Sequence, residues 1–113
     1  MITKTVMKEW GRELWFANTL FYLGKVIYMD SNASTSLHFH MKKDETILVW
    51  QGTLKVEGDI VGQFTGGDII HVPPLRKHRL ISIGDDTLIL FEVSTPHPDD
   101  NTRVEEDGDS SET

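Results

Sequence analysis

The sequence contains no cysteine, which excludes disulfide bonds and thiolate metal ligands. It has no apolar run close to the roughly 20 residues of a membrane-spanning helix, and its first residues, MITKTVMKEWGREL, carry charges where a secretory signal would be apolar. Basic residues number 11 against 18 acidic ones and form no stripe of the kind that binds nucleic acid. We therefore expect a cytoplasmic protein without nucleic-acid or membrane partners.

The net charge of −7 is concentrated at one end of the chain. Residues 99–113 contain seven acidic residues and one basic residue, so the rest is close to neutral. A length of 113 residues suits one domain and is too short for two independent cores. The composition therefore predicts one globular domain followed by a solvated, frayed acidic end.

Short runs of β-branched and aromatic residues, separated by Gly, Pro, Asn and Asp, fill the chain from residue 20 onward. They predict about eight strands at hairpin spacing, in an all-β antiparallel sandwich or barrel. The expected strands cover residues 20–29, 36–40, 45–50, 53–57, 60–64, 68–72, 78–83 and 87–93.

One earlier segment, residues 7–18, has an ambiguous pattern. Its apolar residues Met7, Trp10, Leu14 and Trp15 fit a helical stripe loosely, whereas Gly11 disfavours a helix. It is the only stretch for which a helix is expected.

Three histidines and a glutamate form the candidate site. Alternate side chains of a strand share one face, so His38 and His40 point the same way. Glu45 follows a short connection that would return the next strand beside His40, and His78 begins a later strand. Each residue alone is more typical of an ordinary strand position than of a ligand.

Together, three imidazoles and one carboxylate suit a divalent metal ion such as Zn, Fe, Mn, Ni or Co. Four protein ligands could complete a tetrahedral zinc site. On an octahedral ion they would leave two positions open for a substrate, whose oxygen the metal would polarise. Either way, we expect one metal ion held by His38, His40, Glu45 and His78.

The spacing of these residues resembles the first motif of the cupin superfamily. That motif has His, one residue, His, three or four residues, Glu, six residues and Gly. Here His38, His40, Glu45 and Gly52 match it with four and six intervening residues. The resemblance implies an antiparallel double-stranded β-helix, or jelly-roll barrel.

The second cupin motif has Gly, five residues, Pro, one residue, Gly, two residues and His. Gly67, Pro73 and His78 match it, but Leu75 stands where the second glycine is usual. This departure puts the turn before His78 in doubt, although adjacent prolines could stiffen it.

Longer stretches resemble the type II phosphomannose isomerase domain that ends bifunctional mannose-1-phosphate guanylyltransferases. The matching pieces cover about residues 10–107 and include WGRELWF, NTLFYLGK, SLHFH, KDE, GTLKV, HRL and FEVSTPHPDDNTRVEED. The resemblance implies a stand-alone cupin domain over residues 1–107 and a frayed acidic tail over residues 108–113. Two features depart from the family: His38 stands where Gln is usual, and the usual Tyr-Gly-Arg ending is absent.

The resemblance implies interconversion of mannose 6-phosphate and fructose 6-phosphate, with zinc as the first choice of metal. Such an isomerase moves a proton between C1 and C2 and needs a base and cations for the phosphate. Lys25, Arg79 and Arg103 are the candidate cations, with Arg79 expected to point away from the metal. The catalytic base is unassigned. The candidate is Glu92, which could face the interior or pair with Arg103 as a structural strut.

Other functions use the same ligand set. A metal-dependent dioxygenase or another small-acid cupin enzyme would use it with Fe, Mn or Ni, and a non-catalytic sugar-binding module could retain it. A metal-free nucleotide-sugar epimerase is disfavoured, because it has no need of four ligands. Oxygen uptake, or binding without turnover, would separate these alternatives from an isomerase.

We also expect a homodimer, because an exposed N-terminal strand invites edge pairing. The tryptophans Trp10, Trp15 and Trp50 could stack on a sugar ring, but are more typical of a core or a dimer interface.

Overall fold

The computed structural model describes residues 3–104, so the acidic tail and the expected domain end at residue 107 lie outside the described residues. All regular elements of the described part are strands. They are β1 (Lys4–Lys8), β2 (Gly11–Asn18), β3 (Leu23–Met29), β4 (His38–Phe39), β5 (Glu45–Gln51), β6 (Thr53–Gly58), β7 (Gly62–Thr65), β8 (Ile69–Val72), β9 (His78–Ile83), β10 (Leu88–Ser94) and β11 (Thr102–Arg103).

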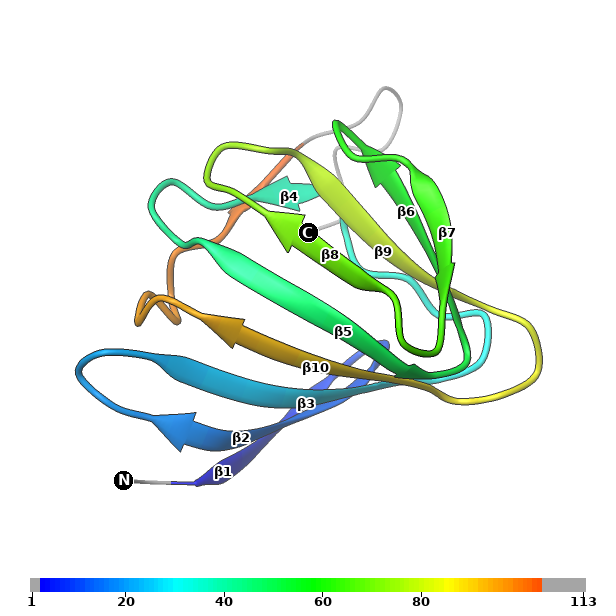
Figure 1. The fold of residues 1–113 in the computed structure, drawn as a ribbon, viewed down its shortest axis with the longest axis horizontal. Coiled ribbons are helices and arrows are strands. Elements are labelled where there is room, and N and C mark those ends of the chain that lie inside the picture. Colours follow the sequence, from blue (N-terminus) through cyan, green and yellow to red (C-terminus); the bar gives the residue numbers. More distant parts are fainter. Residues whose placement is uncertain (1–2, 105–113) are drawn as a thin grey trace.

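The strands form two antiparallel sheets (Figure 1). The larger has six strands in the order β1-β2-β3-β10-β5-β8, and the smaller has five in the order β11-β4-β9-β6-β7. The expected all-β antiparallel architecture is therefore confirmed. Residues 3–104 contain no helix of the length and apolarity needed to cross a bilayer.

The inward faces of the sheets are apolar at one end and polar at the other. In β5 the inward residue Glu45 precedes Ile47 and Val49, and in β9 His78 precedes Leu80. Antiparallel register brings the polar ends of neighbouring strands together, since Glu92 of β10 pairs with Lys25 of β3, and Ser94 of β10 pairs with Glu45 of β5. The core therefore fills one end. Its buried members are Ile27, Met29, Ile47, Val49, Leu54, Val56, Ile70, Val72, Leu80, Leu88 and Leu90.

The helix considered for residues 7–18 is wrong, because this segment is a β1–β2 hairpin. Glu13, Trp15 and Ala17 are buried at alternate positions, the period of a strand. Gly11 has a φ of 149°, and a Cβ there would clash with the carbonyl oxygen of Tyr28 on β3. Glycine is therefore required for this strand to approach its neighbour.

Candidate metal centre

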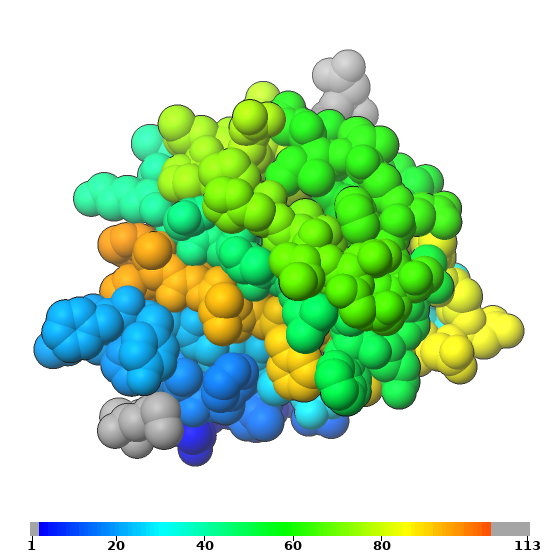
Figure 2. Space-filling view, in the orientation of Figure 1, coloured from blue at the N-terminus to red at the C-terminus, as the bar shows by residue number. Residues whose placement is uncertain are grey.

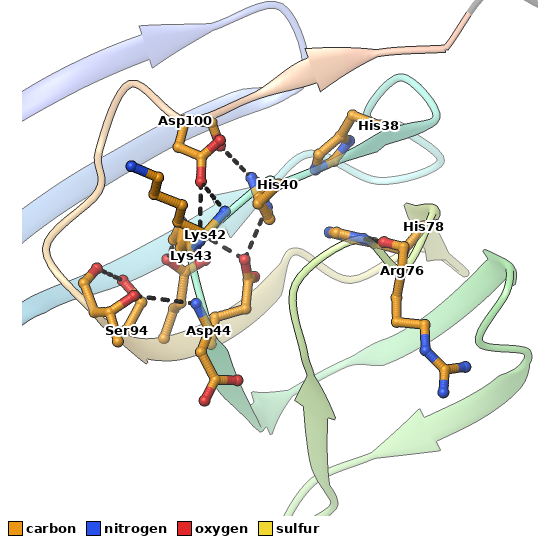
Figure 3. A network of polar contacts seen from close by, with 12 residues as sticks. His38, His40, Lys42, Lys43, Asp44, Arg76, His78, Ser94 and Asp100 are labelled. Carbon is orange, nitrogen blue, oxygen red and sulfur yellow. Dashed lines mark hydrogen bonds and ion pairs between the residues drawn. The ribbon is translucent and has the colours of Figure 1, made fainter.

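Three histidines from distant parts of the chain meet at the polar end. His38 and His78 face each other in the register of β4 and β9, and His40 follows β4 directly. One ring nitrogen of each lies within 4.8 Å of the others (Figure 3). His38 and His40 thus share a face, as their spacing predicts.

Each of these imidazoles has its Nδ1 directed at a backbone carbonyl. Nδ1 of His38 lies 2.7 Å from the oxygen of Ser36. Nδ1 of His40 lies 2.5 Å from the oxygen of Asp100, and Nδ1 of His78 lies 2.8 Å from that of Arg76. A carbonyl only accepts, so every Nδ1 carries a proton, and Nε2 is the atom that each ring would offer to a metal ion. The Nε2 of His78 is buried without a hydrogen-bond partner among the described residues, as expected of an unused ligand atom.

Burial sets the protonation of two of these rings. It lowers the pKa of His38 to about 4, with the nearby His78 adding to the effect, and it also lowers the pKa of His78. Both rings are therefore neutral near pH 7, the form that binds metals.

Glu45, the first residue of β5, is buried beside His40. Its Oε2 lies 2.9 Å from Nε2 of His40 and 3.6 Å from Nζ of Lys43. Burial disfavours the charged forms of both His40 and Glu45, but their contact outweighs it. Glu45 therefore raises the pKa of His40. His40 and Lys43 in turn lower the pKa of Glu45. Glu45 thus reaches one of the three imidazoles, and its role as a fourth ligand stays a prediction.

The donor set fits a divalent metal ion. Zn, Fe, Ni and Co all accept imidazole nitrogen as a ligand. Two of the three imidazoles are already neutral, and the third would release one proton when a metal ion binds.

Asp100 fixes the loop between β4 and β5. Its carboxylate accepts the backbone N–H groups of Met41, Lys42 and Lys43 at 2.9, 2.6 and 2.9 Å (Figure 3). Desolvation would raise the pKa of Asp100, but these three donors hold it down at about 2. Because its own carbonyl also accepts a hydrogen bond from His40, Asp100 links this loop to a candidate metal ligand. In the sequence, the only signal for Asp100 is that it lies in the family-like piece FEVSTPHPDDNTRVEED.

The turn before His78 keeps its shape without the second motif glycine. Leu75 has a φ of 71°, in the left-handed region that favours glycine, and its N–H donates to the carbonyl of His40 at 2.7 Å. The sequence put this turn in doubt. The structure forms it with a strained leucine.

A cavity of about 760 Å³ surrounds the histidines. Most of its lining side chains are polar or charged, and Lys25, Arg79, Glu92 and Arg103 are all among the lining residues. Arg103 lies opposite His38 in the register of β11 and β4, so both side chains share a face. Arg79 reaches Glu57 of β6 at 3.8 Å.

A chain of buried charges leads away from the histidines along the larger sheet. Glu92 faces the interior, and its Oε2 lies 2.9 Å from Nζ of Lys43. Burial raises the pKa of Glu92, and the charge of Glu45 adds to this. Lys25, opposite Glu92 in the register, pairs with Glu13 at 3.3 Å. Sequence analysis did not name Lys43 as a site residue, although it begins the family-like piece KDE, because a lysine in a loop is ordinarily exposed.

Two of the tryptophans are packed into the molecule. Trp15 is buried and donates to Glu13 at 2.9 Å, and Trp10 packs against the core. Trp50 is exposed on the outside of the larger sheet.

The fold and the histidine cluster together define a small cupin-type double-stranded β-helix with a candidate metal site. No family model and no curated protein matches the chain, but many solved structures do. One is a double-stranded β-helix protein of Klebsiella pneumoniae, with 18% identity, coverage of 91% of this chain and 86% of that one, and a TM-score of 0.74.

Two further structures carry functional names. A cupin-superfamily sugar phosphate isomerase of Silicibacter pomeroyi is 20% identical, with a TM-score of 0.73. The match covers 85% of this chain and 66% of that one. The polyketide cyclase RemF of Streptomyces resistomycificus is 16% identical, with a TM-score of 0.81. The match covers 97% of this chain and 85% of that one. At these identities the likeness establishes the fold and leaves the activity open.

Proposed function

We propose that this protein is a metal-dependent sugar-phosphate isomerase that interconverts a mannose 6-phosphate-type aldose and a fructose 6-phosphate-type ketose. The observation that carries the proposal is the convergence of His38, His40 and His78 in a polar cavity, with the Nε2 of His78 buried and unpartnered. A divalent ion held there would supply positive charge for the oxygen atoms of a bound sugar.

The polar cavity supports a sugar rather than an apolar substrate. Hydroxyl groups need hydrogen-bond partners when they leave water, and the lining supplies carboxylates, ammonium groups and hydroxyls. The named activity of the Silicibacter pomeroyi structure supports the same substrate class.

Glu92 is the candidate base. Aldose–ketose isomerisation removes a proton from one carbon and returns it to the next, which requires a base whose pKa lies near the working pH. The buried carboxylate of Glu92 lines the cavity, and its pKa is shifted upward by burial. Its contact with Lys43 would orient it toward a substrate.

The phosphate would bind beside the histidines, where Arg103 shares the face of His38. Arg103 is the preferred cation because a guanidinium matches the geometry of a phosphate and because it lines the cavity on the strand next to the metal site. Lys25 is a weaker choice, since Glu13 already neutralises it at 3.3 Å.

The test begins with elemental analysis of protein purified without chelators or added metals. Interconversion of mannose 6-phosphate and fructose 6-phosphate is then measured before and after chelation. We expect turnover that chelation abolishes and that one metal restores, without oxygen uptake.

The matched variants are His78→Gln, in the cluster, and His71→Gln, at an exposed histidine that pairs with Asp44. Only His78→Gln is expected to lose metal and turnover. Oxygen consumption, or tight binding of both sugars without turnover in the metal-loaded protein, would replace the proposal by one of the alternative cupin functions.

A further inference from the structure

Lys43 is an unusual residue for a loop position. Its side chain is only 6% exposed, whereas Lys42 beside it lies at the surface. A lysine is rarely buried unless its charge is paired. The three backbone bonds to Asp100 fix the loop that carries it. The loop conformation thus places an ammonium group inside the cavity.

The ammonium group contacts the carboxylate oxygen nearest to the histidines. Oε2 of Glu45 lies 3.6 Å from Nζ of Lys43 and 2.9 Å from Nε2 of His40. A metal ion on the cluster would be drawn to this same oxygen. Two cations that share one carboxylate oxygen weaken each other's hold on it, and they also repel each other across a poorly solvated space.

We infer that Lys43 competes with the bound metal ion for Glu45 and thereby limits the metal affinity of the three-histidine site. The inference rests on the metal site of the proposed function, but not on its substrate or reaction. Lys43 is accordingly a positioning residue. Its ammonium contacts the carboxylates of both Glu45 and Glu92, at 3.6 and 2.9 Å, and Glu45 in turn contacts His40.

The experiment measures the affinity for Co²⁺ by competition with a chromophoric chelator, together with the visible absorption spectrum of the bound ion. Lys43→Met is expected to bind Co²⁺ at least about tenfold more tightly than the unmodified protein, because a nearby positive charge is removed and Glu45 is released. The spectrum is expected to change as the carboxylate coordinates more closely. Loss of a merely structural residue would leave affinity unchanged or lower it.

Two lysine variants control for charge alone. Lys42→Met removes the same charge from the neighbouring exposed position, and Lys25→Met removes it from the lysine paired with Glu13. Lys42→Met is expected to stay within about twofold of the parent affinity, since an exposed charge is weakly felt. Lys25→Met is expected to give a smaller gain than Lys43→Met, because the ion-pair partner of Lys25 is Glu13 and not Glu45. An equal gain in Lys25→Met would attribute the effect to cavity charge and overturn the inference.

A double-mutant cycle with Glu45→Gln identifies the shared carboxylate. In the Glu45→Gln background, Lys43→Met is expected to give a clearly smaller gain in Co²⁺ affinity, because only the direct repulsion between Lys43 and the ion is then removed. A full gain in that background would overturn the inference.

Lys43→Met leaves Glu92 without its ammonium partner, which could impair folding. The variant Lys43→Met/Glu92→Gln removes both charges of that pair, and a smaller gain is expected from it, because Glu45 is still released while the net charge of the cavity is unchanged. If this folded variant binds Co²⁺ no more tightly than the parent protein, Lys43 has only a structural role and the inference is wrong. If neither parent nor variants bind Co²⁺, both the inference and the metal site fail. If they bind it as expected but isomerise no sugar, only the proposed reaction fails.

Discussion

At the scale of single residues, three chemically identical imidazoles acquire different proton affinities from their surroundings. Burial lowers the pKa of His38 and His78, while a carboxylate contact raises that of His40. The sequence identifies all three as histidines on cavity-facing positions. The expected return of the next strand beside His40 is wrong, because β4 and β5 belong to different sheets. Glu45 nevertheless lies beside His40, at 2.9 Å from its Nε2.

The depressed pKa of His38 predicts an acid-sensitive fold in the metal-free protein. The unfolded chain takes up a proton near pH 6.5, whereas the folded ring does so only near pH 4, so the free energy of unfolding falls as pH decreases between these values. At pH 4.5 this difference corresponds to about 2–3 kcal/mol. Urea unfolding of metal-free protein at pH 7 and pH 4.5 measures it.

The matched variant is His38→Gln, which is expected to lose less stability between the two pH values than the parent protein. The raised pKa of His40 acts in the opposite direction, since its stabilisation is complete at low pH and is lost as pH rises through that pKa. An equal pH dependence in the parent and in His38→Gln would contradict the assigned burial effect.

At the scale of elements, the two short connections around the site are built differently from what their sequences suggest. The turn before His78 holds Leu75 at a φ of 71°. The β4–β5 loop depends on Asp100, some sixty residues along the chain from His40. Neither feature follows from local sequence preference, because the first contradicts it and the second is a long-range contact.

Leu75→Gly is expected to stabilise the protein. A leucine in the left-handed region costs about 1 kcal/mol, part of which is offset by the greater freedom of glycine in the unfolded chain. We expect a gain of up to about 1 kcal/mol in chemical denaturation. The control is Leu20→Gly, at an exposed leucine without a positive φ, which should lose stability. A loss in both variants would show that Leu75 is not strained.

Asp100→Ala is expected to weaken metal binding about tenfold, as do other changes to groups that orient metal ligands. Three N–H groups lose their acceptor, and the loop that follows His40 is loosened. Calorimetric titration with Zn²⁺ measures the effect. Asp99→Ala removes the neighbouring exposed carboxylate and should be near neutral. Equal effects of both variants would point to lost negative charge instead of loop geometry.

At the scale of the whole molecule, the larger sheet is apolar on its outer face as well as its inner one. One row in register crosses five strands of it, through Leu14, Val26, Phe91, Leu48 and Ile69. Figure 2 shows this face, with the strands running as blue, orange and green bands. Strands that are apolar on both faces are typical of a covered sheet.

We predict a homodimer, either through this outer face or through the edge strand β1. Light scattering after size exclusion should give twice the mass of the chain. Ile69→Lys places a charge on an exposed residue of the face and should yield a monomer if the face is the interface. A dimer that survives this change would assign the contact to β1, and a monomeric parent protein at high concentration would exclude both.

The sequence by itself determined the strand-rich fold, the three candidate histidines and the alternation that puts His38 and His40 on one face. These features follow from composition, spacing along the chain and the two-residue period of a strand. Residues 12–18 also alternate between buried and exposed side chains, as in a strand. In the sequence, a loose helical stripe of apolar residues masks this pattern, and the burial of Trp15 and Ala17 reveals it.

Only the tertiary structure decided which charges meet. The sequence does not show that Lys43 is buried while Lys42 is exposed, that Glu92 faces Lys43 or that Asp100 fixes the β4–β5 loop. The physical reason is that distances across a sheet depend on register and packing between segments far apart in the chain, whereas sequence patterns report only distances along it.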